Sequence, residues 1–127
     1  MKGIQKYTFP ISKSSTLRIG VVVHTSQAKL NARHRKITGG EVGEVEAFCH
    51  YEHVPSTDKI AELHFYRQHI TPQLIAHEAF HATLVLARHW HADLENGDME
   101  EMLAETIENI ILSTLNLIWM PAKKDKL

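Results

Sequence analysis

The chain has 127 residues, of which 43% are hydrophobic and 23% charged, with a formal net charge of −1. This length and composition predict one globular domain spanning residues 1–127. The near-neutral charge excludes a general electrostatic attraction to nucleic acid or to anionic membranes, so neither is an expected partner.

The cysteine content and the distribution of apolar residues favour a cytoplasmic protein. Cys49 is the only cysteine, and one thiol cannot form an internal disulfide. Residues 1–10 contain no apolar run suited to a signal peptide. The most apolar stretch, residues 107–120, is interrupted by polar side chains that disfavour a membrane span.

The N-terminal half predicts a sheet. Four segments are rich in β-branched and apolar residues or alternate with period two, namely residues 7–11, 17–24, 44–51 and 59–66. The polar and basic residues 25–36 are compatible with a helix beginning after Thr25 or Ser26, and also with a loop. We interpret the basic cluster at residues 33–36 as a solvated surface.

The C-terminal half predicts two long helices. Thr71 and Pro72 supply a hydroxyl N-cap and a proline at the first helical position of a helix extending to about residue 90. After a break at Asn96-Gly97, Asp98 begins a second helix that ends at about residue 119. We therefore expect an α+β fold, with an antiparallel or mixed sheet of three to four strands followed by two long helices.

Histidine is frequent, with ten in the chain, and two of the ten have the spacing of metal ligands. His77 and His81 lie four residues apart in the first predicted helix, so both imidazoles can reach one ion. From the adjacent position, the Glu78 carboxylate can take a proton from a water that the metal activates. Ala79 and Phe80 are uncharged, as a buried helix requires. This segment predicts a zinc site with Glu78 as general base.

A catalytic zinc site needs a third protein ligand and an open position. The second predicted helix offers four carboxylates: Glu100, Glu101, Glu105 and Glu108. Antiparallel contact between the helices would bring its first turns near the histidines, which favours Glu101 and Glu105. Glu100 is explained by its place near a helix N-terminus, where acidic residues are favoured anyway. Asp93 and Asp98 are further candidates for the third ligand.

The pattern His77-Glu78-x-x-His81 followed by Glu101-x-x-x-Glu105 resembles the zincin metallopeptidases of the gluzincin branch. The 20 residues from His81 to Glu101 look like the shorter gluzincin spacing. The resemblance implies that His77, His81 and Glu101 bind Zn²⁺ and that Glu78 is the general base. It also implies that Glu105 holds an imidazole N–H from the second shell. The expected activity is that of a zinc-dependent metallohydrolase, a peptidase acting on a peptide or protein substrate.

The resemblance covers about residues 59–118 and carries a further expectation for the sheet. In zincins, the strand before the active helix is often the sheet edge that pairs with an extended substrate, and Lys59–Tyr66 sits in the matching place. No tyrosine or histidine after Glu105 is available to stabilise an oxyanion. His89, His91 and Tyr66 are open candidates for that role.

Other zinc patterns fit the sequence less well. A metzincin would have glycine and histidine at the positions of Leu84 and Ala87. Peptide deformylase uses an upstream cysteine ligand, but the residues around Cys49 do not resemble its cysteine loop. We interpret Cys49 as a small core residue. His64 shares a strand face with Glu62, and we interpret it as solvent-exposed or as lining the cleft.

Two alternative functions remain open from the sequence. The first is a regulatory or binding module whose zinc site is structural or vestigial, with Glu105 or His89 as a fourth ligand. The second is a nucleic-acid partner that binds through residues 29–36. Replacement of Glu78 distinguishes the enzyme from the binding module, because only the enzyme needs a general base.

Overall fold

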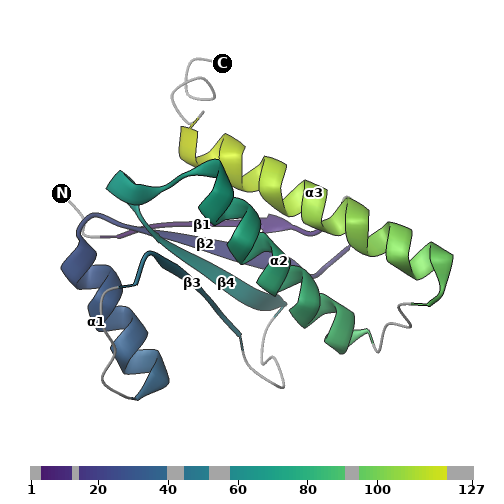
Figure 1. The fold of residues 1–127 in the computed structure, drawn as a ribbon, viewed down its shortest axis with the longest axis horizontal. Helices are drawn as coiled ribbons and strands as arrows, with labels where there is room; N and C mark the ends of the chain where they lie inside the picture. The colour runs from purple at the N-terminus through teal and green to yellow at the C-terminus, as the bar shows by residue number, and fades with distance from the viewer. Residues whose placement is uncertain (1–3, 13–14, 40–44, 52–57, 91–94, 120–127) are drawn as a thin grey trace.

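The computed structural model describes residues 4–12, 15–39, 45–51, 58–90 and 95–119 (Figure 1). Its elements follow the order β1 (Ile4–Pro10), β2 (Arg18–His24), α1 (Gln27–Thr38), β3 (Ala47–His50), β4 (Lys59–Tyr66), the 3₁₀ turn η1 (Arg67–His69), α2 (Pro72–His89) and α3 (Gly97–Trp119). The predicted α+β class is confirmed. The described ranges contain a further helix, α1, where the sequence left a helix and a loop open. None of the helices in these ranges is both long and apolar enough to cross a bilayer.

Helix α1 forms from a polar sequence because both of its ends are capped. The Ser26 side chain accepts a hydrogen bond from the backbone N–H of Lys29 at 3.1 Å. Gly39 adopts a left-handed conformation with φ of 72°, and its N–H donates to the carbonyl of Arg35. Leu30 is the residue that α1 buries, so the helix contributes little apolar surface to the core.

The four strands form a mixed sheet in the order β1-β2-β4-β3. Strands β2 and β4 are parallel, whereas β1 and β3 pair antiparallel with their neighbours. A parallel pair needs a crossover connection, and α1 lies within the connection from β2 to β4. The expectation that Lys59–Tyr66 is the sheet edge is therefore wrong, because β4 pairs on both sides. The edge strand on that side of the sheet is β3, Ala47–His50.

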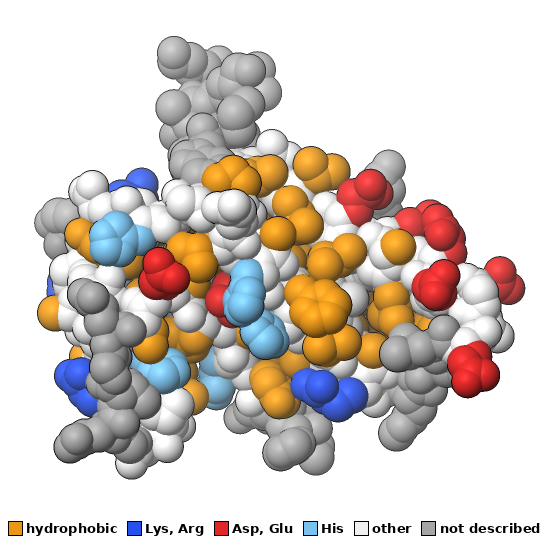
Figure 2. All heavy atoms as spheres, viewed as in Figure 1, with side chains coloured by type: hydrophobic (Ala, Val, Ile, Leu, Met, Phe, Trp, Pro, Cys, Tyr) orange, Lys and Arg blue, Asp and Glu red, His pale blue; other side chains and the backbone are white. Residues whose placement is uncertain are grey.

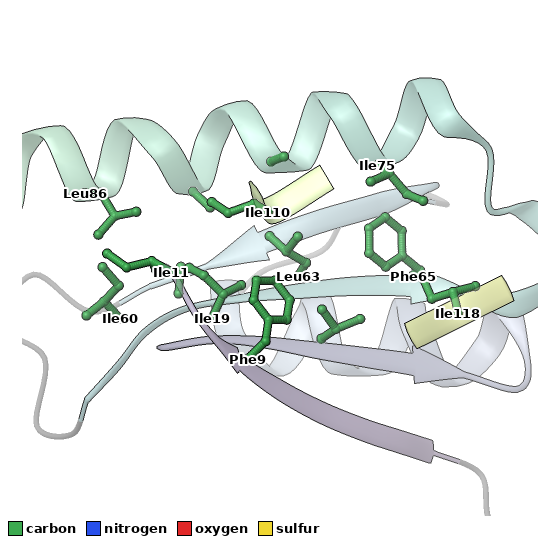
Figure 3. Close-up of a cluster of buried hydrophobic side chains, with 14 of the residues drawn as sticks. Phe9, Ile11, Ile19, Ile60, Leu63, Phe65, Ile75, Leu86, Ile110 and Ile118 are labelled. Carbon is green, nitrogen blue, oxygen red and sulfur yellow. The ribbon is translucent and has the colours of Figure 1, made fainter. Parts of the chain in front are cut away.

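One face of the sheet packs against α2 and α3 (Figure 3). Alternate residues of β2 and β4 point into this core, as the period-two pattern requires, and they include Ile19, Leu63 and Phe65. Helix α2 contributes Ile75 and Leu86, both fully buried. Because this apolar stripe of α2 is held against the sheet, the opposite side of the helix faces outward.

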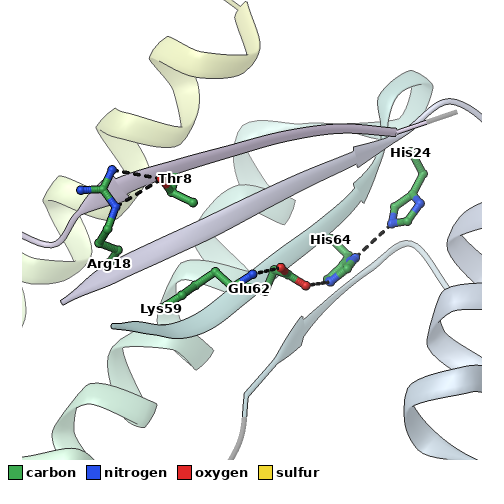
Figure 4. A network of polar contacts seen from close by, with 6 residues as sticks. All are labelled: Thr8, Arg18, His24, Lys59, Glu62 and His64. Carbon is green, nitrogen blue, oxygen red and sulfur yellow. Dashed lines mark hydrogen bonds and ion pairs between the residues drawn. The ribbon is translucent and has the colours of Figure 1, made fainter. Parts of the chain in front are cut away.

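The other face of the sheet holds a chain of polar side chains (Figure 4). The His24 Nε2 and His64 Nδ1 atoms lie 3.0 Å apart, and His64 Nε2 lies 2.8 Å from Glu62 Oε1. Lys59 Nζ donates to the second Glu62 oxygen at 2.6 Å. The Phe48 ring stacks on His64 with centroids 4.3 Å apart. His64 is only 1% exposed, so its interpretation as solvent-exposed is wrong.

The geometry assigns the tautomers of the two buried histidines. His64 Nε2–H donates to the Glu62 carboxylate, which leaves His64 Nδ1 to accept from His24 Nε2–H. Burial lowers the pKa of His24 to about 4, and the nearby charges of His64 and Arg33 act in the same direction. Burial also lowers the pKa of His64, against the opposing effect of Glu62. Both rings are therefore neutral in the folded protein at neutral pH.

The two buried histidines predict that the fold loses stability in mild acid. Because the histidine pKa values are lower in the folded than in the unfolded protein, the unfolded chain binds more protons below about pH 6.5. The free energy of unfolding should decrease as the pH falls from about 6.5 toward about 4. The glutamine amide of His24→Gln can still donate to His64. Between pH 7 and pH 5, the melting temperature of this variant, without metal, should therefore fall less than that of the wild-type protein. His89→Gln, which changes an exposed histidine, is the control. An equal dependence of the melting temperature on pH in the wild type and both variants would contradict the prediction.

Candidate metal centre

Helix α2 begins where the sequence predicts. The Thr71 hydroxyl accepts the backbone N–H of Leu74 at 3.1 Å, and Pro72 occupies the first turn. The buried residues of α2 face the sheet, whereas His77 and His81 are exposed. Phe80 is 53% exposed, so its expected burial is wrong. The motif therefore lies on the open side of a helix that is fixed along its other side.

The two predicted histidine ligands converge on one point. His77 Nε2 and His81 Nε2 lie 3.3 Å apart, and the ring centroids are 4.9 Å apart at an interplanar angle of 73°. Two nitrogen ligands of a tetrahedral zinc at 2.0–2.1 Å are separated by about 3.3–3.4 Å. Both this pair and the buried pair of His24 and His64, whose nitrogens lie 3.0 Å apart, are also within hydrogen-bonding distance. The spacing of His77 and His81 thus fits two corners of a zinc tetrahedron.

Glu78 lies beside this pair but on the buried side of the helix surface. It is 4% exposed, and it lines two cavities that His77 also lines. Burial raises the pKa of its carboxyl group above the ordinary value, and the charge of His77 opposes the shift. A carboxylate in such surroundings holds a proton more readily than an exposed one, which suits a general base.

A groove runs between α2 and the edge strand β3. One half is a cavity of about 600 Å³ whose lining includes Glu46, His69 and Gln73. The other half is a cavity of about 390 Å³ whose lining includes Cys49, Tyr51, Leu84 and Arg88. Both halves share Ala47, His77 and Glu78. The candidate base and the first histidine therefore stand at the middle of the groove.

Cys49 lines this groove in surroundings that disfavour the thiolate form of its side chain. Burial raises the pKa of its thiol to about 12, and the charge of Glu78 adds to that shift while Arg88 opposes it. A thiol with such a pKa stays protonated at neutral pH, and a metal ligand or nucleophile must be a thiolate. The position of Cys49 therefore agrees with the interpretation of a packing residue.

The structure does not bring Glu101 or Glu105 to the histidines. Within the described ranges, no group of three histidine, cysteine or acidic residues could hold a metal ion. Glu105 lines a separate cavity of about 450 Å³ with Trp90 and Met102. Figure 2 shows acidic side chains gathered where α3 begins, with hydrophobic surface between them and the histidines over α2.

The length of α2 accounts for this separation. The helix continues to His89, eight residues past His81, which is about 12 Å along its axis. The chain then returns as α3, so its first turns lie beside Trp90 rather than beside the histidines. The expectation that the start of the second helix lies near His77 and His81 is therefore wrong for this arrangement.

The remaining candidates are placed as follows. Asp93 and His91 lie outside the described residues. Asp98 is exposed in the first turn of α3, where Asn96 Oδ1 accepts its backbone N–H at 2.9 Å. His89 is exposed at the end of α2, and the Tyr66 ring meets the His69 ring edge-on at 4.7 Å. Neither His89 nor Tyr66 lines the two cavities of the groove.

Two features of the groove were missed by sequence reasoning. The pairing of β4 with β2 could not be foreseen, so β3 was not recognised as the edge beside the motif. Arg88 could have been found, because positions 77, 81, 84 and 88 recur at spacings of three and four residues. This recurrence places Arg88 on the same helical face as the histidines.

A scan against protein-family models and searches of curated proteins and of solved structures each give no match. The assignment of function therefore rests on the chemistry and geometry of the residues around the groove.

Proposed function

We propose that this chain is a zinc-dependent metallohydrolase that cleaves peptide bonds. The observation that carries the proposal is the 3.3 Å separation of His77 Nε2 and His81 Nε2, directly above a groove that Glu78 lines. Three kinds of group needed for metal-assisted hydrolysis thus meet in one place: two imidazole donors, a carboxylate base and a space for substrate.

His77 and His81 fit a zinc ion by donor type and by spacing, and they would bind it through Nε2. Zinc in such a site supplies a Lewis acid that polarises a carbonyl group and lowers the pKa of water. We retain Glu101 as the proposed third ligand on the basis of its 20-residue spacing from His81. Its carboxylate is exposed in the second turn of α3, with no ion pair to another described residue.

Glu78 acts in this proposal as the general base. Its carboxylate accepts a proton from the attacking water and returns it to the leaving amine. The low exposure of Glu78 favours this cycle, since burial raises its pKa and brings the carboxyl closer to working pH. Glu105 follows Glu101 by four residues. By the resemblance to gluzincins, it is the proposed partner of the N–H of a ligand imidazole.

A peptide fits this groove better than a compact substrate does. Strand β3 pairs with β4 along one edge, and its other edge is the outer edge of the sheet, beside α2. An extended peptide can add to such an edge through main-chain hydrogen bonds while its side chains enter the adjoining cavities. This edge, which pairs with no other strand of the described residues, therefore supports a peptide or protein substrate.

The proposal predicts metal-dependent peptide cleavage. Zinc-loaded protein should cleave members of a mixed peptide library, identified by mass spectrometry of the products. Chelation should stop cleavage, and one added equivalent of zinc should restore it, because the metal supplies the Lewis acid. Cleavage that survives chelation would contradict the proposal.

The binding-module alternative rests on one observation, the lack of a third donor next to the histidines among the described residues. A closed structural site would need four protein ligands, and two are present at this point. The two functions differ in their dependence on Glu78, whose replacement should leave a binding module unaffected.

A further inference from the structure

The half of the groove that extends toward the end of α2 carries a cationic side chain. Arg88 lines the cavity of about 390 Å³ together with His77, Glu78 and His81. Its position on the helix, seven residues after His81, places it on the same face of α2. Arg88 therefore faces the same space as the proposed zinc ligands.

The guanidinium group of Arg88 is held over an aromatic ring and has no ion-pair partner among the described residues. Its Cζ atom lies over the ring of Tyr51, 5.3 Å from the ring centroid, which is a cation–π contact. Arg88 is exposed and forms no ion pair within the described part of the chain. A guanidinium held over an aromatic ring keeps its N–H edge available, and that edge matches a carboxylate.

The two halves of the groove differ in charge. The cavity on the other side of Glu78 is lined by the exposed Glu46 and, among the described residues, by no lysine or arginine. The groove is therefore basic at the Arg88 end and acidic at the Glu46 end. This asymmetry favours a ligand that places a carboxylate over Arg88 and no negative charge at the opposite end.

The direction of β3 indicates which part of a peptide reaches Arg88. Val45 lines the groove beside Gln73, and Tyr51 lines it beside Arg88, so β3 and α2 run in the same direction. A peptide pairing antiparallel with the free edge of β3 would run the opposite way. Its N-terminal part would lie over Arg88, and its C-terminal part would lie near Glu46.

The distance from the histidines to Arg88 sets the position of the carboxylate. Seven helical residues rise about 10 Å, which equals about three residues of extended peptide. We propose that Arg88 is a specificity-determining residue that binds a substrate carboxylate. That carboxylate is an acidic side chain about three residues N-terminal to the bond that is cleaved. This inference rests on the proposed peptidase function.

Peptide binding tests the inference without requiring turnover. The probes would be fluorescein-labelled decapeptides whose other residues are all uncharged. Each peptide carries one Glu or one Gln, the position of which is varied along the series, and each is made with a free and with an amidated C-terminus. Their dissociation constants would be measured by fluorescence anisotropy on zinc-loaded Glu78→Gln protein. The Glu peptides should bind about tenfold more tightly than the Gln peptides, which is the effect of one charge-assisted contact in a partly exposed site. Added salt should reduce the preference.

Variants of Arg88 identify the source of the preference. In the Glu78→Gln background, Arg88→Gln should abolish it, Arg88→Lys should keep part of it, and the remote Arg35→Gln should leave it intact. A preference that persists in Arg88→Gln, or equal binding of Glu and Gln peptides, would overturn the inference. A preference for free over amidated C-termini would overturn the assignment to a side chain.

Failure of the proposed function would give a different pattern. If wild-type protein cleaves none of the bound peptides, the hydrolase proposal is contradicted. A preference for Glu that still depends on Arg88 would, in that case, support carboxylate recognition by a binding groove.

Discussion

Replacement of Glu78 with glutamine is expected to reduce zinc-dependent peptide cleavage by about 10²–10⁴-fold, the usual contribution of a general base. The amide has nearly the shape of the carboxylate but cannot accept a proton from water. His77 and His81 are unchanged, so the affinity for zinc should stay within a few-fold of the wild-type value. Rates and zinc affinity would be measured on the same preparation.

Stability measurements separate this effect from misfolding. Burial raises the pKa of the Glu78 carboxyl in the folded protein, so its ionised form costs stability at neutral pH. Metal-free Glu78→Gln should therefore melt at the wild-type temperature or above it at pH 7. The difference should disappear below the ordinary glutamate pKa, where both side chains are neutral. Glu108→Gln, an exposed change on α3, is the control, and near-wild-type cleavage by Glu78→Gln would disprove the role of a base.

Loss of a metal ligand is expected to have the second large effect. His81→Ala and Glu101→Ala should each weaken zinc binding by about 100-fold or more, exceeding the 10- to 100-fold cost of losing an outer-shell partner. Competition with a chromophoric chelator measures these affinities. His69→Ala and Glu100→Ala are the matched controls. His69 is an exposed histidine of the same groove, and Glu100 is the exposed glutamate that precedes Glu101.

The two ligand variants test separate parts of the proposal. Wild-type affinity in His81→Ala would contradict the zinc site itself. Wild-type affinity in Glu101→Ala, together with loss in His81→Ala, would exclude Glu101 and agree with its position away from the histidines in the structure. Loss in both variants would show that Glu101 reaches the histidines of α2 when zinc is present.

Local sequence signals predicted the helix that carries the motif. Thr71 and Pro72 define its start, and the four-residue spacing of His77 and His81 defines the face they share. These signals were sufficient because capping and helical periodicity act over a few neighbouring residues. The same reasoning identified α1 as one of two possibilities for its segment.

Long-range contacts were not accessible in this way. The burial of His64 depends on α1, which packs on this face of the sheet, and on the Phe48 ring, which stacks on the imidazole; a period-two pattern does not reveal which face is covered. The inner position of β4 depends on its pairing with β2. The first residues of these two strands, Arg18 and Lys59, are 41 positions apart in the sequence. The distance of Glu101 from the histidines depends on where α2 ends, and helix ends are weakly specified by sequence.

X-ray absorption at the zinc edge, on protein loaded with one equivalent, tests the central claim most directly. The proposal predicts nitrogen and oxygen ligands at about 2.0–2.1 Å, with the outer-shell scattering of two imidazoles. One of those imidazole signals should disappear in His81→Ala. A spectrum without imidazole scattering, or one that His81→Ala does not change, would show that the convergent histidines of α2 are not a zinc site.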